Sequence, residues 1–151
     1  MTPPGTDAGP GATEGMRLDL EAMRGCFDGV VPPVIATCSA DGTPNLTHLS
    51  QLFPVDAEHL ALSNQFFGKT SANLAENPRS SVLVTDSITD RTYRFELRFE
   101  RTETSGPLFE ALRASIDAVA SLTNMEHVFA LRGADVHRVL RWTLVSSPGG
   151  W

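Results

Sequence analysis

Polar and apolar residues alternate more regularly between Thr92 and Arg101 than elsewhere in the chain. An alternation with a period of two places successive side chains on opposite faces of a β-strand. We therefore predict a strand over residues 92–101, with an apolar face in the core and a charged face in solvent. The predicted inward residues are Tyr93, Phe95, Leu97 and Phe99, and the outward ones are Arg94, Glu96, Arg98 and Glu100.

Shorter apolar or alternating stretches predict further strands. They cover residues 34–39, 45–53, 59–64, 81–85, 128–131 and 136–144. The turn signals between them are Asp41-Gly42, which is typical of a hairpin, and residues 54–58, 86–90 and 133–135. The stretch 45–53 differs from the others because neither of its faces is cleanly apolar. Such a strand either lines a site or lies at the edge of a sheet.

About three helices are predicted at the margins of these strands. Residues 18–27 carry an approximate helical stripe of apolar side chains, and a short helix follows Lys69 until Asn77-Pro78 stops it. A third helix is expected to open at Ser105-Gly106-Pro107, as a cap followed by an early proline, and to end near Ser121. Strands joined mostly by tight turns indicate a mainly β (α+β) fold, a small antiparallel barrel.

The domain limits follow from composition. Residues 17–145 are expected to form one domain, since a chain of 151 residues is large enough to bury a core. Residues 1–16 are rich in Pro, Gly and Thr and are predicted to be a disordered tail rather than a signal peptide. Residues 146–151 carry no pattern and are expected to be a C-terminal tail.

Charge and cysteine content exclude some classes of partner. A net charge of −6 and a pI near 5.1 argue against nucleic acid or an anionic membrane, because both require basic patches. No apolar run approaches the length of a membrane span. Cys26 and Cys38 fit no metal-ligand spacing, so no metal is expected, and buried thiols in a cytoplasmic protein are the simpler interpretation.

The stretch from Leu60 to Arg79 reads as a strand, a loop and a short helix. The loop holds Lys69, the only lysine of the chain, and Thr70 and Ser71 follow it. A lysine, two hydroxyls and the first N–H groups of a helix together suit an anionic group such as phosphate. An ordinary corner, in which Thr or Ser caps the helix, fits the same spacing.

Other motifs of known chemistry are missing. The sequence Gly68-Lys69-Thr70 lacks the earlier glycine of a nucleotide-binding P-loop, because that position is Ser63. Neither a dinucleotide-binding fingerprint nor a hydrolase nucleophile elbow occurs. The four histidines lack metal-ligand spacing, and His48 stands out only because it lies on the polar stretch 45–53.

Three segments carry a resemblance to a known family. They read A-T-C-S-A-D-G-T-P-N-L-T-H, D-A-E-H-L-A-L-S-N and K-T-S-A-N-L-A-E-N-P-R-S-S-V-L-V. The third is the most specific, because it joins a lysine, a short helix, Asn-Pro-Arg and a buried strand. Together they resemble the flavin-binding split β-barrel family that includes pyridoxamine 5′-phosphate oxidase. The resemblance extends over residues 18–144 and is most convincing over residues 36–84.

The resemblance implies a homodimer that holds FMN at its interface. By position, Lys69 would pair with the FMN phosphate, and Ser63 and Thr70 would donate hydrogen bonds to it. The stretch Thr47, His48, Leu49 and Ser50 would run beside the isoalloxazine ring, with Asn64 at the mouth of the site. An oxidoreductase reduced by NAD(P)H and acting on an unknown small substrate is the implied activity, with His48 as the candidate for proton transfer.

Two departures from the oxidase matter. Thr47 and Gly68 stand where the oxidase has arginines that help to hold the phosphate, and the C-terminal third does not match its substrate-binding signature. Oxidation of vitamin B6 is therefore not supported. The alternatives are a non-catalytic module that binds flavin, deazaflavin or haem for sensing or storage, and a barrel without a ligand that serves as an interaction domain.

Overall fold

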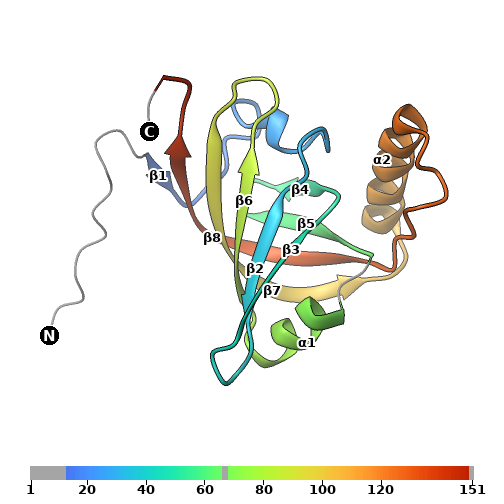
Figure 1. Ribbon diagram of the computed structural model, residues 1–151, viewed down its shortest axis with the longest axis horizontal. Helices are drawn as coiled ribbons and strands as arrows, with labels where there is room; N and C mark the ends of the chain where they lie inside the picture. Colours follow the sequence, from blue (N-terminus) through green and yellow to red (C-terminus); the bar gives the residue numbers. More distant parts are fainter. Residues whose placement is uncertain (1–12, 66–67, 150–151) are drawn as a thin grey trace, which may run out of the picture.

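The computed structural model describes residues 13–65 and 68–149, and within them eight strands form one antiparallel sheet. The strands are β1 (Glu14–Gly15), β2 (Val34–Cys38), β3 (Pro44–His48), β4 (Leu52–Asp56), β5 (His59–Asn64), β6 (Arg79–Thr85), β7 (Thr92–Glu103) and β8 (Gly133–Ser146). Their order is β3-β2-β6-β7-β8-β5-β4, with β1 added on β8. The sheet curls around a common centre without closing (Figure 1). The predicted antiparallel, β-dominated fold is confirmed.

Within residues 13–65 and 68–149, two α-helices accompany the sheet instead of about three. Helix α1 (Gly68–Glu76) lies at one end of the curled sheet, and α2 (Pro107–Thr123) stands beside it (Figure 1). Helix α2 begins at the expected proline, but Gly106 occupies the N-cap position and no side chain caps the helix. Most of the predicted N-terminal tail lies outside the described residues, and β1 falls within its last part.

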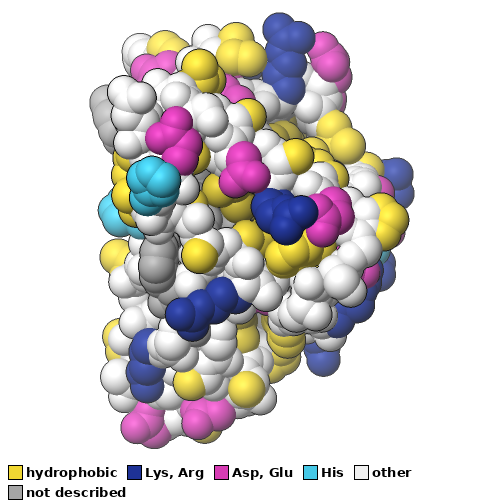
Figure 2. Space-filling model, turned by 90° about the vertical axis from the view of Figure 1, so that its right-hand side faces the viewer, with side chains coloured by type: hydrophobic (Ala, Val, Ile, Leu, Met, Phe, Trp, Pro, Cys, Tyr) yellow, Lys and Arg dark blue, Asp and Glu magenta, His cyan; other side chains and the backbone are white. Residues whose placement is uncertain are grey.

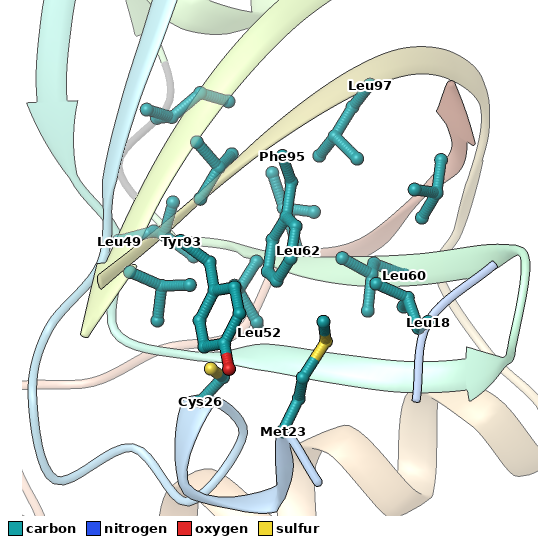
Figure 3. Packing of buried hydrophobic residues seen from close by; sticks show 14 residues of the cluster. Leu18, Met23, Cys26, Leu49, Leu52, Leu60, Leu62, Tyr93, Phe95 and Leu97 are labelled. Carbon is teal, nitrogen blue, oxygen red and sulfur yellow. The ribbon is translucent and has the colours of Figure 1, made fainter. Parts of the chain in front are cut away.

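The core fills the inside of the curled sheet (Figure 3). Phe95 and Leu97 of β7 are fully buried there and Tyr93 nearly so, which confirms the alternation predicted for this strand. From β5, Leu60 and Leu62 point toward them (Figure 3). Burial of each large apolar side chain contributes roughly 1.5–3 kcal/mol, so this cluster is the main source of stability.

The helix predicted over residues 18–27 is wrong. The segment forms turns and one 3-10 turn, η1 (Arg24–Cys26). A Cβ on Gly25 would lie 2.2 Å from Asp86 Oδ1, so the chain passes directly against the turn between β6 and β7. This close approach holds the segment across the barrel end, where Met23 and Cys26 contribute to the core (Figure 3). The apolar spacing in residues 18–27 therefore belongs to an irregular segment that covers the end of the barrel, and not to a helix.

The single strand predicted over residues 45–53 is two strands, because the chain changes partners within it. Strand β3 pairs with β2, and β4 pairs with β5 at the opposite edge of the sheet. Residues 49–51, which we call the crossing segment, connect these two edge strands. The predicted turn at 54–58 is mostly strand as well, since Pro54 lies in β4 next to a bulge. An edge strand tolerates proline because it has no need of the missing N–H donor.

The strand predicted over residues 128–131 is absent, and the predicted turn at 133–135 lies within β8. Phe129 and Leu131 are not in a strand, but both pack against a small buried cluster. This cluster beneath α2 consists of Ala61, Leu112, Ile116 and Ala134. Gly133 opens β8 because there is no space for a larger side chain: a Cβ would lie 2.5 Å from Thr102 Cγ2. Tight packing against β7 therefore explains the glycine that resembled a turn signal.

Candidate functional site

A cavity of about 390 Å³ lies on the outer face of the sheet, between α2 and the crossing segment. Its size falls within the roughly 300–1,000 Å³ typical of ligand sites. Figure 2 views the molecule from the side that carries α2 and shows hydrophobic side chains among charges of both signs. The cavity is lined by Gly29, Val30, Pro32, Thr47, His48, Leu49, Ser50, Gln51, Ser63, Gln65, Ile116, Val119, Thr123, Met125 and Phe129.

One wall of the cavity is polar. The hydroxyls of Ser50 and Ser63 lie 2.8 Å apart, and the backbone N–H of Gln51 donates to Ser63 Oγ over 3.2 Å. Gln65 Nε2 donates to Ser50 Oγ. These contacts join the crossing segment to the end of β5, which fixes hydroxyl and amide groups along one edge of the cavity.

Gln51 holds the parts of the site together. Its Nε2 donates to the Phe27 carbonyl oxygen over 3.0 Å and to Ser115 Oγ of α2 over 2.7 Å. It thus ties the crossing segment to the loop before β2 and to the helix. Within the described part of the chain, Gln51 Oε1 and Gln65 Oε1 are buried without a hydrogen-bond partner. Such atoms are rare in folded proteins, and a ligand is one explanation of them.

The remaining walls are mainly apolar. Ile116 and Val119 project from α2, and Phe129 follows the helix. Leu49 contributes from the crossing segment and is itself buried. An apolar enclosure with hydrogen-bonding groups on one edge suits a flat ligand whose polar atoms lie along one side.

The structure brings together five of the eight residues predicted to bind a cofactor. Thr47, His48, Leu49, Ser50 and Ser63 all line the cavity. His48 is exposed at the end of the edge strand β3. Residues 47–51 of the polar stretch 45–53 therefore line a cavity. A site-lining strand was one of the two interpretations of the pattern in this stretch.

The other three predicted residues lie outside the cavity lining. Asn64 points away from it and donates through Nδ2 to Asp135 Oδ2 over 3.2 Å. Thr70 is buried and accepts a bond of 3.1 Å from Asn45 Nδ2. Lys69 is exposed in the first turn of α1, and no ion pair involves it among the described residues. These residues form the far end of the region, towards α1.

Titratable groups surround that far end. Burial raises the pKa of Asp135, while hydrogen bonds from Thr102 and Asn64 partly oppose the shift. In the hairpin between β2 and β3, hydrogen bonds from Ser39 and Thr43 lower the pKa of Asp41 to about 2. The positive charge of Lys69 makes a smaller contribution in the same direction, which places this ammonium group within electrostatic reach of the hairpin.

Sequence reasoning missed the residues that tertiary packing adds to the cavity. Gln51 lies within the polar stretch and could have been included with its neighbours. Val119 and Thr123 of α2 and Gly29 before β2 could not, because nothing in their local pattern indicates that they meet the crossing segment. Among the described residues, no three His, Cys, Asp or Glu side chains gather in a way that could hold a metal ion.

The fold of this protein is an open antiparallel barrel, or split barrel, with a cavity between its outer face and the flanking helix α2. The family model described as pyridoxamine 5′-phosphate oxidase matches residues 20–140. The chain therefore belongs to the pyridoxamine 5′-phosphate oxidase family. A comparison with curated protein sequences finds no significant match.

Solved structures share the fold at low sequence identity. An FMN-binding protein from Syntrophomonas wolfei is 18% identical with a TM-score of 0.68, and the match covers 85% of this chain and 88% of that one. A FAD-binding protein from Mesorhizobium loti is 18% identical with a TM-score of 0.52, and the match covers 89% of this chain and 99% of that one. HutZ, the haem storage protein from Vibrio cholerae, is 16% identical with a TM-score of 0.53, and the match covers 83% of this chain and 90% of that one. In the described part of this chain, no helix is long and apolar enough to cross a membrane.

Proposed function

We propose that this protein binds FMN and acts as a flavin-dependent oxidoreductase on a small substrate. The observation that carries the proposal is the cavity, with the polar edge of Ser50, Ser63 and Gln65 facing the apolar wall of α2. An isoalloxazine ring matches this chemistry, because its apolar body carries nitrogen and oxygen atoms that need directional partners. Family membership and the FMN- and FAD-binding proteins of the same fold support the choice.

The phosphate of FMN would lie at the α1 end of the site. Lys69 is exposed there, and the first N–H groups of α1 have no partners within the helix. The buried Thr70 hydroxyl accepts a bond from Asn45 and keeps its own proton for donation. Lys69 and Thr70 would thus hold the anionic end, while the residues of the cavity hold the ring.

Bound flavin supplies hydride transfer, with NAD(P)H as the proposed electron donor. This chain contributes the apolar enclosure that excludes water and the polar edge that orients the ring. His48 lines the cavity from an exposed strand end, so its imidazole can exchange protons with solvent and with a bound molecule. We assign it the role of proton transfer.

A homodimer with the cofactor at its interface is part of the proposal. Strands β3, β2 and β6 present an apolar outer face, on which Leu46 is 71% exposed and Leu83 is 45% exposed. A second copy would cover this face and the open edge of β3, next to His48. Sedimentation velocity should give a dimer for the natural chain and a monomer for Leu46→Glu. A natural chain that sediments as a monomer would refute the dimer.

We also infer a cytoplasmic location from the composition of the chain. Both cysteines are free thiols, which suits a reducing compartment. Cell fractionation tests this inference, and recovery of the protein outside the cytoplasm would contradict it.

The visible spectrum of the purified protein tests the choice of cofactor. Flavin bands and saturable FMN titration are expected, together with NAD(P)H consumption above the rate of free FMN. A Soret band would instead favour a haem-binding module, for which His48 offers an iron ligand inside the cavity. Bound flavin or deazaflavin without turnover would favour storage or sensing, and absence of binding would favour an interaction domain.

Substitution of Lys69 tests the placement of the phosphate. Lys69→Ala is expected to weaken FMN binding by about ten- to a hundredfold, because a charge-assisted hydrogen bond contributes roughly 1.5–3 kcal/mol. Riboflavin, which lacks the phosphate, should bind equally to both proteins. Arg91→Ala is the matched control, since Arg91 is exposed in the turn between β6 and β7. Unchanged FMN affinity in Lys69→Ala would show that the phosphate lies elsewhere.

A further inference from the structure

We infer that helix α2 is a lid over the cavity and that Gln51 is the positioning residue that holds this lid closed. The lid does not depend on the proposed function, and only its effect on FMN rests on that function. Helix α2 stands at the margin of the molecule, beside the sheet (Figure 1). In this helix, which the structure describes in full, the buried side chains are Leu112, Ile116 and Ala120. One narrow apolar stripe therefore carries its packing.

A single polar contact adds to this stripe. Gln51 Nε2 donates to Ser115 Oγ of α2 over 2.7 Å. Among the described residues, no other side chain of α2 forms a hydrogen bond or ion pair with a group outside the helix. Gln51 is 2% exposed and lines the cavity, so the bond lies within the wall between the sheet and the helix. We call this hydrogen bond the latch.

The second partner of Gln51 fixes the direction of the latch. Nε2 also donates to the Phe27 carbonyl oxygen over 3.0 Å. A carbonyl oxygen only accepts, so this contact requires Nε2, and not Oε1, on that side of the amide. Phe27 itself packs against the core inside the barrel. The latch therefore joins a part of the protein that is fixed to the core with a helix that is held by few contacts.

The closed position of α2 is imperfectly satisfied. Gln51 Oε1 is buried and has no hydrogen-bond partner in the described part of the chain. A buried acceptor without a partner costs free energy, and water that reaches it when the helix moves away recovers part of this cost. Opening is therefore less unfavourable than the loss of the latch alone would make it. Elements with few buried contacts and partly satisfied polar groups are those that open locally.

Both ends of α2 offer positions at which the chain can bend. Gly106 at the N-cap has a φ of 94°, and a Cβ added to it would meet no described atom within 4 Å. Asn124 at the C-cap is also left-handed, with a φ of 55°. Residues at the ends of elements absorb the changes in φ and ψ when a lid moves. The helix can therefore move as a unit while the sheet keeps its structure.

The inner end of the cavity is enclosed while α2 is closed. Its lining groups Leu49, Ser63 and Gln65 are 3%, 1% and 4% exposed. A molecule in contact with them lies deep between the sheet and α2, and it enters and leaves when α2 opens. A weaker latch then speeds entry and exit by the same factor, because both steps pass through the same open state. The affinity stays nearly unchanged.

Hydrogen exchange of the ligand-free, full-length chain, measured by mass spectrometry of its peptides, tests the lid without any cofactor. Ser115→Ala removes the latch and should speed exchange of the α2 amides by about two- to twelvefold, the equivalent of one neutral hydrogen bond. Exchange in peptides of β7 should not change, because the core is untouched. Ser115→Thr keeps the hydroxyl and should restore slow exchange.

Two further variants control this measurement. Ser121→Ala makes the same substitution at an exposed position of α2 and should leave exchange unchanged. Gln51→Met removes the amide at similar size. In that background Ser115→Ala should have no additional effect, because residues that act through one bond are not additive.

Stopped-flow flavin fluorescence measures the consequence for the site. In Ser115→Ala, the association and dissociation rate constants of FMN should both rise by the factor found for α2 exchange, while Kd changes by less than about twofold. A residue that only contacts the ligand would instead change the dissociation rate and Kd together. The pair of rate constants therefore distinguishes a lid from a binding contact.

The outcomes separate this inference from the proposed function. Unchanged α2 exchange in Ser115→Ala would overturn the inference, and so would an equal increase in β7, which would indicate a general loss of stability. Faster α2 exchange with unaltered FMN rate constants would also overturn the lid, because the ligand would then bypass α2. A natural chain that binds no flavin would overturn the proposed function, and hydrogen exchange alone would then decide whether Gln51 holds α2 closed.

Discussion

The two faces of β5 are both buried, but they are built differently. Leu60 and Leu62 point into the barrel, whereas Ala61 and Ser63 point outward towards α2 and the cavity. Large side chains fill the inner face completely. Small ones on the outer face leave part of the space between the sheet and α2 unfilled, and a cavity of about 390 Å³ lies there. The same strand thus supplies stability on one side and room for a ligand on the other.

The largest expected effect on the free energy of unfolding distinguishes the core inside the barrel from the cluster beneath α2. Phe95→Ala should lower the free energy of unfolding by about 3–5 kcal/mol, because it opens a cavity in a filled core. Phe53→Ala, in the half-buried rim of the cluster beneath α2, should cost clearly less. Guanidinium unfolding followed by tryptophan fluorescence measures both. Equal losses would contradict the contrast between the two faces.

A pH-dependent effect also belongs to the inner face. His137 of β8 is fully buried, with neither ring nitrogen hydrogen-bonded to a described residue, and burial lowers its pKa to about 3. Below pH 6.5, the unfolded chain binds a proton that the folded chain does not, so stability falls as the pH falls. Between pH 7.5 and pH 5 the expected loss is about 2 kcal/mol.

Substitution of this histidine measures its contribution. His137→Phe should remove the loss of stability between pH 7.5 and pH 5, while His127→Gln, at an exposed position, should retain it. The raised pKa of Asp135 acts in the opposite direction and is common to all three proteins. Subtracting the variant's pH profile from that of the natural chain therefore isolates His137. Parallel profiles would mean that its imidazole is hydrogen-bonded in solution.

The smallest effect on stability is expected at the outer face. Val119→Phe places a larger side chain in the cavity from α2 and should weaken FMN binding about tenfold, equivalent to about 1.4 kcal/mol. The free energy of unfolding should change by less than about 1 kcal/mol, because the added ring enters empty space. Leu122→Phe on the same helix is the control, since Leu122 is 86% exposed. If FMN affinity is equal in the two variants, the flavin does not occupy this cavity.

Much of the fold could be predicted where a single physical pattern decides the structure. Strand β7 has one face in the core and one in solvent, so its alternation is unambiguous. Helix α2 carries one buried stripe and begins at a proline. Strand β5 was predicted only as a short stretch between turns, because both of its faces are covered and no alternation remains.

The failures occur where distant segments decide the structure. Residues 18–27 have a helical spacing, but Gly25 is held against the turn at Asp86, which no local pattern encodes. Phe129 is apolar because it lies under α2, and a short apolar run cannot distinguish this from a strand. The site divides in the same way. Motif resemblance identified residues from β3 and β5, whereas the residues of α2 join them only through tertiary packing.

The crossing segment, residues 49–51, has a consequence for how the chain folds. Strands β3 and β4 are consecutive in sequence but form the two opposite edges of the sheet. The central strands β6 and β7 are joined by a short turn, whereas β5 pairs with β8 across some seventy residues of intervening chain. Pairings that close long loops form late. The cavity is therefore completed last, and a bound ligand should slow unfolding while leaving the folding rate nearly unchanged.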